Sequence, residues 1–162
     1  MRALLALVLL CASATACADT LHGVVIVVID GDTVLFKPDH FGAASRAFMK
    51  VRLAGIDAPE ANQPHGEAAT RSLRDMALKQ RASLEIVATD SYGRKLGRLA
   101  VGSLQVNAEL VKHGHAWASS RGPDASLRTL QFDAQRERRG LWQDANPTPP
   151  WVWRRVRSAP AY

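Results

Sequence analysis

The sequence predicts an α+β fold built on a small closed barrel of five strands with three helices. Short apolar runs rich in β-branched residues recur between turn residues over the first two thirds of the chain. One helical pattern falls between the third and fourth runs, and two more follow the last run. This order fits a five-stranded barrel of the oligonucleotide-binding (OB) type. A length of 162 residues favours one domain around one core.

The first three strands are expected between residues 21 and 56. Leu21–Ile29 is a nearly continuous β-branched run, which is typical of a buried strand. Asp30-Gly31-Asp32 then makes a tight turn, and Thr33–Phe36 returns as the second strand of a hairpin. Ala47–Ile56 is the expected third strand.

The later elements alternate between helix and strand. A helix is expected from about Glu67, because Ala69, Leu73 and Met76 recur at helical spacing. Ser83–Val87 and Leu96–Val101 are the expected fourth and fifth strands.

Two further helices are expected near the end of the domain. Asn107 should cap a short helix that stops at Gly114. The last helix should open at Pro123-Asp124, turn Leu127, Leu130 and Ala134 inward, and close at Gly140. Trp142 is the expected last core residue, so we place the domain at 19–142.

The first 18 residues have the pattern of a signal peptide. A charged start precedes a short apolar run, and Ala16-Cys17-Ala18 offers small residues for cleavage after Ala18. The apolar run is too short to span a bilayer comfortably. We expect export to the periplasm or the medium, with a lipoprotein cut before Cys17 as the alternative. Both cysteines lie in this segment, so the mature chain should contain no disulfide.

The full chain is basic. The formal net charge is +6 and the pI is about 9.9, which suggests a polyanionic partner, with nucleic acid first. Residues 143–162 form a basic tail with Trp and Pro, and its Arg154, Arg155 and Arg157 should contact nucleic acid electrostatically. We expect a monomer without a transmembrane helix in the mature chain.

The third expected strand ends in an unusual set of polar groups. Arg52 lies among apolar neighbours, where a charge is costly unless an anion meets it. Asp57 and Glu60 follow, and Pro59 favours an extended Ala58 whose carbonyl is free to bind a ligand. This set suits a metal ion beside a phosphate. The alternative is a structural ion pair between Arg52 and one of the acids.

Other metal motifs do not fit. Asp30-Gly31-Asp32 begins like a calcium loop, but Leu35 and Phe41 stand where an EF-hand needs Gly and Glu, so a simple turn is the alternative. The histidines lack the spacing of a zinc site.

Four motifs follow one another along the chain. They are Val-Ile-Asp-Gly-Asp-Thr at 28–33, Arg-Leu-Ala-Gly-Ile-Asp-Ala-Pro-Glu at 52–60, Asp-Ser-Tyr-Gly-Arg at 90–94 and Val-Asn-Ala-Glu-Leu-Val at 106–111. Together they strongly resemble the staphylococcal nuclease (thermonuclease) family, over about Val24–Trp142. The resemblance implies a five-stranded barrel that hydrolyses DNA and RNA with calcium and leaves 3′-phosphate ends.

The resemblance also implies a role for each matching residue. Ca²⁺ would be held by Asp32, Asp57 and the carbonyl of Ala58, while Asp30 would orient water on the ion. The scissile phosphate would be bound by Arg52 and Arg94. Glu60 would be the general base and Tyr92 would touch the substrate phosphate.

The chain departs from the family pattern in three places. Ser91 replaces a lysine, the loop after Glu60 is short and lacks a lysine cluster, and Ser119 and Ser120 fall near an expected aromatic pair. Trp117 or the Trp151–Trp153 segment could replace that pair as a stacking surface. The rival interpretation is a non-catalytic OB-fold module that binds nucleic acid, but such a module would be expected to lose one of the site's charged residues.

Overall fold

The computed structural model describes residues 20–119 and 124–157. The expected signal peptide, Ser120 and Pro123 lie outside the described residues. No helix within the described ranges is both long and apolar enough to cross a membrane.

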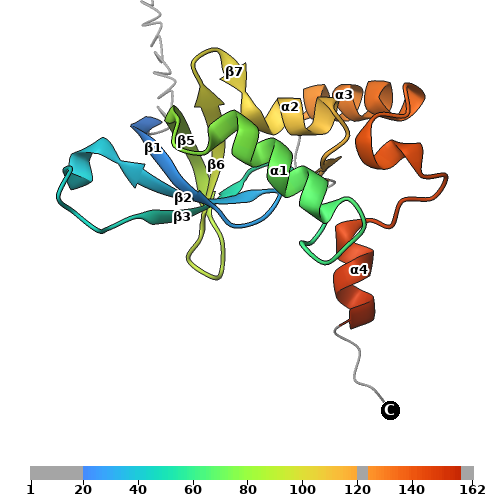
Figure 1. Cartoon of the computed structure of the whole chain (residues 1–162), viewed down its shortest axis with the longest axis horizontal. Coiled ribbons are helices and arrows are strands. Elements are labelled where there is room, and N and C mark those ends of the chain that lie inside the picture. The colour runs from blue at the N-terminus through green and yellow to red at the C-terminus, as the bar shows by residue number, and fades with distance from the viewer. Residues whose placement is uncertain (1–19, 120–123, 158–162) are drawn as a thin grey trace, which may run out of the picture.

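Five strands form a closed barrel, as the sequence predicts (Figure 1). They lie in the order β3-β2-β1-β5-β6, and parallel pairing of β3 with β6 closes the sheet on itself. Closure leaves no long unpaired edge, which would otherwise invite another strand to add. The strands are β1 (Thr20–Val28), β2 (Thr33–Pro38), β3 (Met49–Leu53), β5 (Arg81–Thr89) and β6 (Lys95–Val101).

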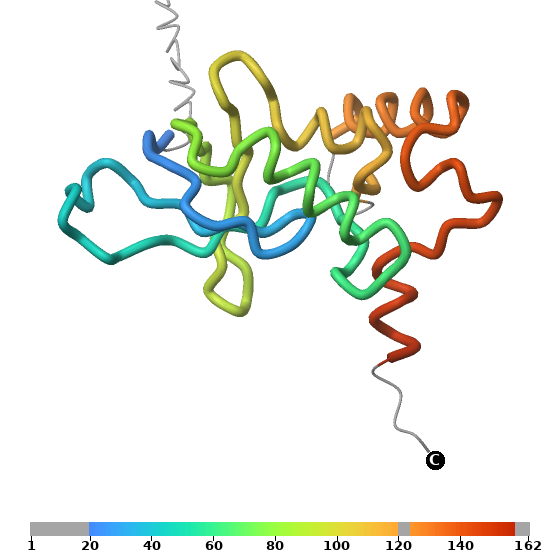
Figure 2. Tube along the Cα trace, in the orientation of Figure 1, coloured from blue at the N-terminus to red at the C-terminus, as the bar shows by residue number. Residues whose placement is uncertain are grey.

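Within residues 20–119 and 124–157, four α-helices accompany the barrel, one more than the sequence predicts (Figures 1 and 2). The helix α1 crosses the barrel, α2 and α3 lie beside one another, and α4 stands apart from them near the C-terminus. The short strand β7 (Leu104–Gln105) extends the sheet at β6. The helices are α1 (Gly66–Ala77), α2 (Val106–Lys112), α3 (Ala125–Arg136) and α4 (Pro150–Arg157), with 3₁₀ turns η1 (Asp39–Phe41) and η2 (Gly140–Gln143).

The expected third strand is interrupted. It ends at Leu53, turns at Gly55 with a φ of 76°, and resumes as the two-residue strand β4 (Ile56–Asp57). A positive φ is cheap for glycine and strained for other residues. The strand β4 pairs with β8 (Trp117–Ala118) instead of the barrel, so Asp57 projects from a separate small sheet.

The core runs from the barrel to the helices. Phe36, Val51 and Leu84 are fully buried in the barrel, and Leu73 of α1 and Leu110 of α2 pack into the same cluster. The expected inward residues of α3 are confirmed for Leu127 and Ala134, which are buried, and for Leu130, which is partly buried. At the end of the domain Leu141 is fully buried, whereas Trp142 is only half-buried against Trp117.

The sequence predicts that Asn107 caps α2, and this prediction is wrong. The cap position belongs to Gln105, and Asn107 is buried in the first turn. Its side-chain oxygen accepts a hydrogen bond from the Leu99 backbone N–H, and its Nδ2 donates to the carbonyls of Ala54 and Gly97. One amide therefore joins α2, β6 and the turn after β3.

Replacing Asn107 should be costly, because it leaves buried backbone groups without partners. We expect Asn107→Ala to lower the free energy of unfolding by about 2–4 kcal/mol. Gln105→Ala, which removes an exposed amide two residues away, should change it by less than about 0.5 kcal/mol. Urea denaturation followed by tryptophan fluorescence would measure both values. Equal losses in the two variants would contradict the joining role of Asn107.

Candidate active site

Arg52 joins a carboxylate of the turn before β2 to a carboxylate of β4. It lies on β3 with its side chain 21% exposed, its Nη1 donates to Asp32 Oδ1 at 2.8 Å, and its Nη2 donates to Asp57 Oδ1 at 2.7 Å. Burial opposes the charge of the guanidinium, but the two carboxylates more than compensate and raise its pKa above the ordinary value. The structural ion pair that the sequence left open is therefore present, and it involves two acids.

The turn before β2 delivers Asp32 to this pair. Asp30 Oδ1 accepts a hydrogen bond from the Asp32 N–H, which fixes the turn. A side chain at Gly31 would overlap Ala58 and Ala69 of α1, whose Cβ atoms lie 2.7 and 2.8 Å from the position of a Cβ there. The absence of a side chain thus lets the turn approach Ala58, and the Ala58 N–H donates to Asp32 Oδ2 at 2.9 Å.

Asp32 is an electrostatically strained carboxylate. It is 3% exposed, and burial raises its pKa from 3.8 to about 7. Arg52 and the Ala58 N–H lower the value, while the charges of Asp30 and Asp57 raise it further. One guanidinium therefore does not fully compensate the acidic groups gathered here.

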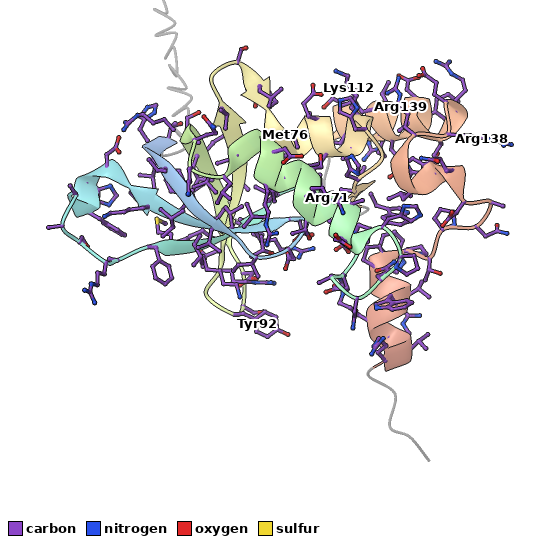
Figure 3. All side chains as sticks on the ribbon, viewed as in Figure 1. Arg71, Met76, Tyr92, Lys112, Arg138 and Arg139 are labelled. Carbon is purple, nitrogen blue, oxygen red and sulfur yellow. The ribbon has the colours of Figure 1, made fainter. Side chains whose placement is uncertain are left out.

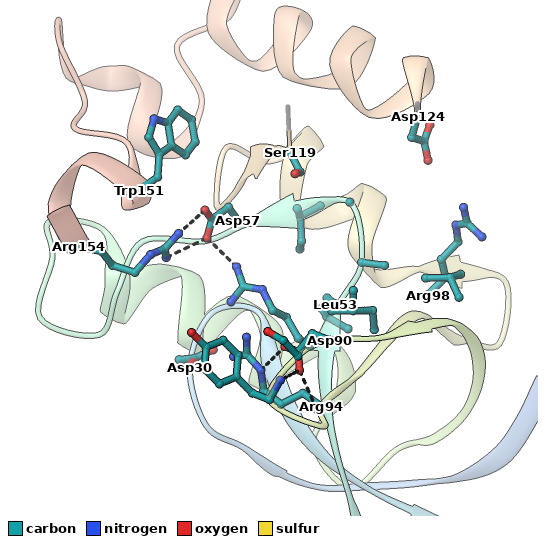
Figure 4. Close-up of a pocket in the computed structure, with 18 of the residues that line it drawn as sticks. Asp30, Leu53, Asp57, Asp90, Arg94, Arg98, Ser119, Asp124, Trp151 and Arg154 are labelled. Carbon is teal, nitrogen blue, oxygen red and sulfur yellow. Dashed lines mark hydrogen bonds and ion pairs between the residues drawn. The ribbon is translucent and has the colours of Figure 1, made fainter. Parts of the chain in front are cut away.

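Glu60 and Asp57 are joined by a residue far along the chain. Arg154 of α4 donates from Nη1 to Glu60 Oε1 at 2.6 Å. It also donates from Nη2 to Asp57 Oδ2 at 2.7 Å (Figure 4). Its Nη1 also lies 3.2 Å from Asp57 Oδ1. These bonds, with that to Asp57 the largest, raise the pKa of Arg154.

The helix α4 is held over the loop that follows Glu60. Gln63 Nε2 donates to the Thr148 carbonyl just before the helix, and Trp153 Nε1 donates to Asn62 Oδ1. Trp151 makes an edge-on contact with Trp117, with ring centroids 6.3 Å apart. Residues that the sequence assigned to a basic tail thus reach the site.

The hairpin between β5 and β6 supplies the other side of the site. Asp90 accepts hydrogen bonds from the backbone N–H groups of Tyr92 and Arg94, and its Oδ2 accepts from Arg94 Nε at 2.7 Å. Tyr92 is 85% exposed at the hairpin tip (Figure 3), and the Arg94 guanidinium lies 5.7 Å from the centre of its ring. Asp90 therefore sets the direction of Arg94.

These groups line one cleft of about 1280 Å³. Figure 4 shows the Arg154 side chain entering it from α4, with Asp90 and Arg94 on the opposite side. Six of the residues expected in the site share this lining, namely Asp30, Arg52, Asp57, Glu60, Tyr92 and Arg94.

Two of the expected ligands lie behind the cleft instead. Asp32 and Ala58 are 3% and 4% exposed and touch one another through the Ala58 N–H. Asp32 reaches the cleft residues through Arg52.

Of the two surfaces that the sequence analysis offers for stacking on a base, one is wrong. Trp117 is 5% exposed and packs against Trp142 and Trp151, so it cannot stack on a base. Trp151 is 40% exposed and lines the cleft, as does Ser119. The Trp151–Trp153 segment therefore remains as the candidate.

Arg154 is the site residue that sequence analysis missed as a partner of the carboxylates. A helix signal was present, because Pro150 suits the first turn of a helix and three arginines suit its last turn. Nothing local shows that Arg154 meets acids more than ninety positions earlier.

The acidic groups fit a hard divalent cation. The candidate ligands offer only oxygen atoms, which such cations prefer, and the burial that raises the pKa of Asp32 disfavours its ionised form unless a cation meets it. Within the described ranges, no group of three or more His, Cys, Asp and Glu side chains is gathered for a metal. Because side chains alone do not form such a group, a cation site here would combine the Asp32 and Asp57 carboxylates with the backbone carbonyl of Ala58.

The family model "Staphylococcal nuclease homologue" matches residues 50–144. The chain belongs to the staphylococcal nuclease family. The matched segment includes Arg52, Asp57, Glu60 and Arg94, whereas α4 lies beyond it.

Several relatives of this chain carry nuclease names. It is 38% identical to an uncharacterized endonuclease of Escherichia coli O157:H7, over 85% of this chain and 87% of the relative. It is 36% identical to a micrococcal nuclease of Shigella flexneri, over 96% and 92% of the two chains. A probable staphylococcal-like nuclease of rice is 35% identical over 65% of this chain and 32% of its own.

The raised pKa of Asp32 predicts a pH-dependent loss of stability without divalent cations. Below about pH 4 the carboxyl is protonated in both states and contributes no slope. Between pH 4 and 7 the folded chain keeps a proton that the unfolded chain releases, so the free energy of unfolding falls as pH rises. Asp32→Asn should flatten this fall by up to about 1.4 kcal/mol per pH unit.

Urea denaturation in chelator at several pH values between 4 and 8 would measure the difference. Asp75→Asn, which changes an exposed aspartate of α1, should leave the wild-type profile unaltered. A wild-type slope retained in Asp32→Asn would show that another group causes it.

Proposed function

We propose that this protein is an exported, calcium-dependent nuclease that cuts DNA, RNA or both within the strand and leaves 3′-phosphate ends. The observation that carries the proposal is the meeting of Arg52, Asp57, Glu60, Tyr92 and Arg94 in one cleft. Membership of the family and the nuclease relatives make the chain a phosphodiester hydrolase. Calcium, export and the 3′-phosphate product are the finer parts of the proposal.

Two guanidiniums would bind the scissile phosphate. Arg52 and Arg94 come from different elements of the barrel and line the same cleft. Asp90 accepts a hydrogen bond from Arg94 Nε, and this bond directs the guanidinium. The bond does not involve the two terminal nitrogens of Arg94. Charge-assisted bonds from both arginines would meet the extra negative charge that develops on the phosphoryl oxygens as water attacks.

Glu60 would accept the proton of the attacking water. Its side chain is 37% exposed in the cleft, so water can reach it, and its backbone is held by Gln63. Attack on phosphorus with departure of the 5′ oxygen gives a 3′-phosphate and a 5′-hydroxyl. A calcium ion held by Asp32, Asp57 and the Ala58 carbonyl would supply Lewis acidity toward a phosphate oxygen.

A binding module without catalysis is the rival function. It needs the basic and aromatic lining of the cleft but gives no role to Glu60 and Asp57. A base is worth about 10²–10⁴ in rate and little in affinity, so one substitution separates the two functions.

Plasmid and RNA should be cut in calcium and left intact in chelator. Glu60→Gln should slow cleavage by about 10²–10⁴ while binding to an oligonucleotide persists, because the change removes a proton acceptor and not a cation. Glu67→Gln, the same change in an exposed residue of α1, should cut at the wild-type rate.

Cleavage by Glu60→Gln at the wild-type rate would reject Glu60 as the base. Binding of nucleic acid without any cleavage by the wild type in calcium would favour the binding module. Cleavage in chelator would reject the metal requirement.

The proposal of export rests on residues 1–18, whose pattern is that of a signal peptide. Mass spectrometry of the protein from its native host should find Asp19 as the first residue. A lipid-modified Cys17 would instead indicate a lipoprotein, and an intact leader in the cytoplasm would reject export.

A further inference from the structure

The helix α4 brings a third arginine to carboxylates that the proposed function assigns to the cation and to the base. Arg154 lies outside the segment that matches the family model, which ends at residue 144. It lines the cleft together with Arg155 of the same helix. The inference below rests on the proposed roles of Asp57 and Glu60.

Arg154 covers both oxygens of Asp57. Its Nη2 donates to Oδ2 at 2.7 Å and its Nη1 to Oδ1 at 3.2 Å, while Arg52 already binds Oδ1 from the barrel side. A divalent ion that binds Asp57 needs at least one of these oxygens. A divalent ion placed on either oxygen would be repelled by the adjacent guanidinium of Arg154, so the ion meets Arg154 as a competitor.

Arg154 also holds Glu60. The 2.6 Å bond from its Nη1 to Glu60 Oε1 occupies an oxygen that would accept the proton of water. While this bond is made, that oxygen is not open to an attacking water. The contact therefore blocks the two functions of the acidic pair together.

The attachment of α4 is weak enough to be reversed. Of its residues only Pro150 is buried, and Arg154 has a side-chain exposure of 42%. Among the described residues, the contacts that attach this segment to the rest of the protein include the hydrogen bond of Trp153 to Asn62, the bond of Gln63 to Thr148 and the edge contact of Trp151. Elements with few buried apolar contacts open locally at low cost.

We propose that Arg154 is a built-in competitor of the divalent cation, which binds Asp57 and Glu60 in the free protein and must leave them when the ion enters. The ion-free site is thus closed by the chain's own cation. Entry of the ion and displacement of the Arg154 side chain are one coupled equilibrium. The apparent affinity for the ion is therefore the intrinsic affinity multiplied by the fraction of molecules in which Arg154 is released.

Calcium binding without nucleic acid tests this proposal. Isothermal titration calorimetry should compare the full chain with Arg154→Gln and Arg155→Gln, which remove the same charge from neighbouring positions of one helix. Arg154→Gln should bind calcium about five- to tenfold more tightly than Arg155→Gln, because only the former removes the competitor. Both variants lose one positive charge, so the general effect of that charge on calcium affinity cancels when the two are compared.

A more conservative variant, Arg154→Lys, keeps the proposal testable if Arg154→Gln does not fold. Arg154→Lys keeps the charge but loses the planar fork that reaches Asp57 and Glu60 together. Its calcium affinity should fall between those of the wild type and Arg154→Gln. Calcium should also alter the tryptophan fluorescence of the wild type, and Trp153→Phe should reduce that change, because Trp153 is bonded to the loop beside the site.

Equal calcium affinities of Arg154→Gln and Arg155→Gln would overturn the proposal. Weaker binding by Arg154→Gln would also overturn it, since Arg154 would then be positioning the ligands. If the wild type cuts in calcium and the two affinities are equal, the proposed function stands and this inference fails. If no variant binds calcium, both the cation and the competition are rejected.

Discussion

The bridge that Arg52 makes between Asp32 and Asp57 is the interaction on which the site depends. Asp32 is buried where a lone carboxylate would be costly, and Arg52 provides the first compensating charge. The same guanidinium ties the start of β2 to the end of β4, two elements that share no strand pairing. Breaking the bridge would leave a buried acid uncompensated and would release Asp57 from the barrel, so stability and site geometry rest on one group.

The cleft is built from parts that differ in rigidity. Arg52 comes from a strand paired on both sides, whereas Tyr92 lies at the tip of a hairpin and Arg154 on a helix with little buried surface. The groups assigned to phosphate binding are thus fixed in part by the barrel and in part by the Asp90 bonds of the hairpin. The side of the cleft that carries the basic helix is thus anchored by little buried surface.

Much of this arrangement could be predicted from the sequence, and the exceptions have physical causes. The barrel strands were predictable because apolar, β-branched runs stand between turn residues, and Arg52, Asp57, Glu60 and Arg94 were predictable because they belong to recognisable motifs. The pairing of β4 with β8 was not, since two-residue strands have no periodicity. The role of Asn107 was hidden because an amide at a helix start usually caps, and here it bonds to carbonyls of other elements. Arg154 was hidden because arginines in a basic segment look alike until the fold brings acids to one of them.

The tight loop between Glu60 and Gly66 has a consequence for how this protein can diverge. A Cβ at Gly66 would lie 1.9 Å from the Glu60 carbonyl oxygen, so the loop closes on itself with no spare room, and its Asn62 and Gln63 side chains hold the segment that leads into α4. The loop and α4 therefore depend on one another. A chimera that receives a longer loop from a relative would lose the contacts that hold α4. Only the exchange of both segments together would preserve this wall of the cleft.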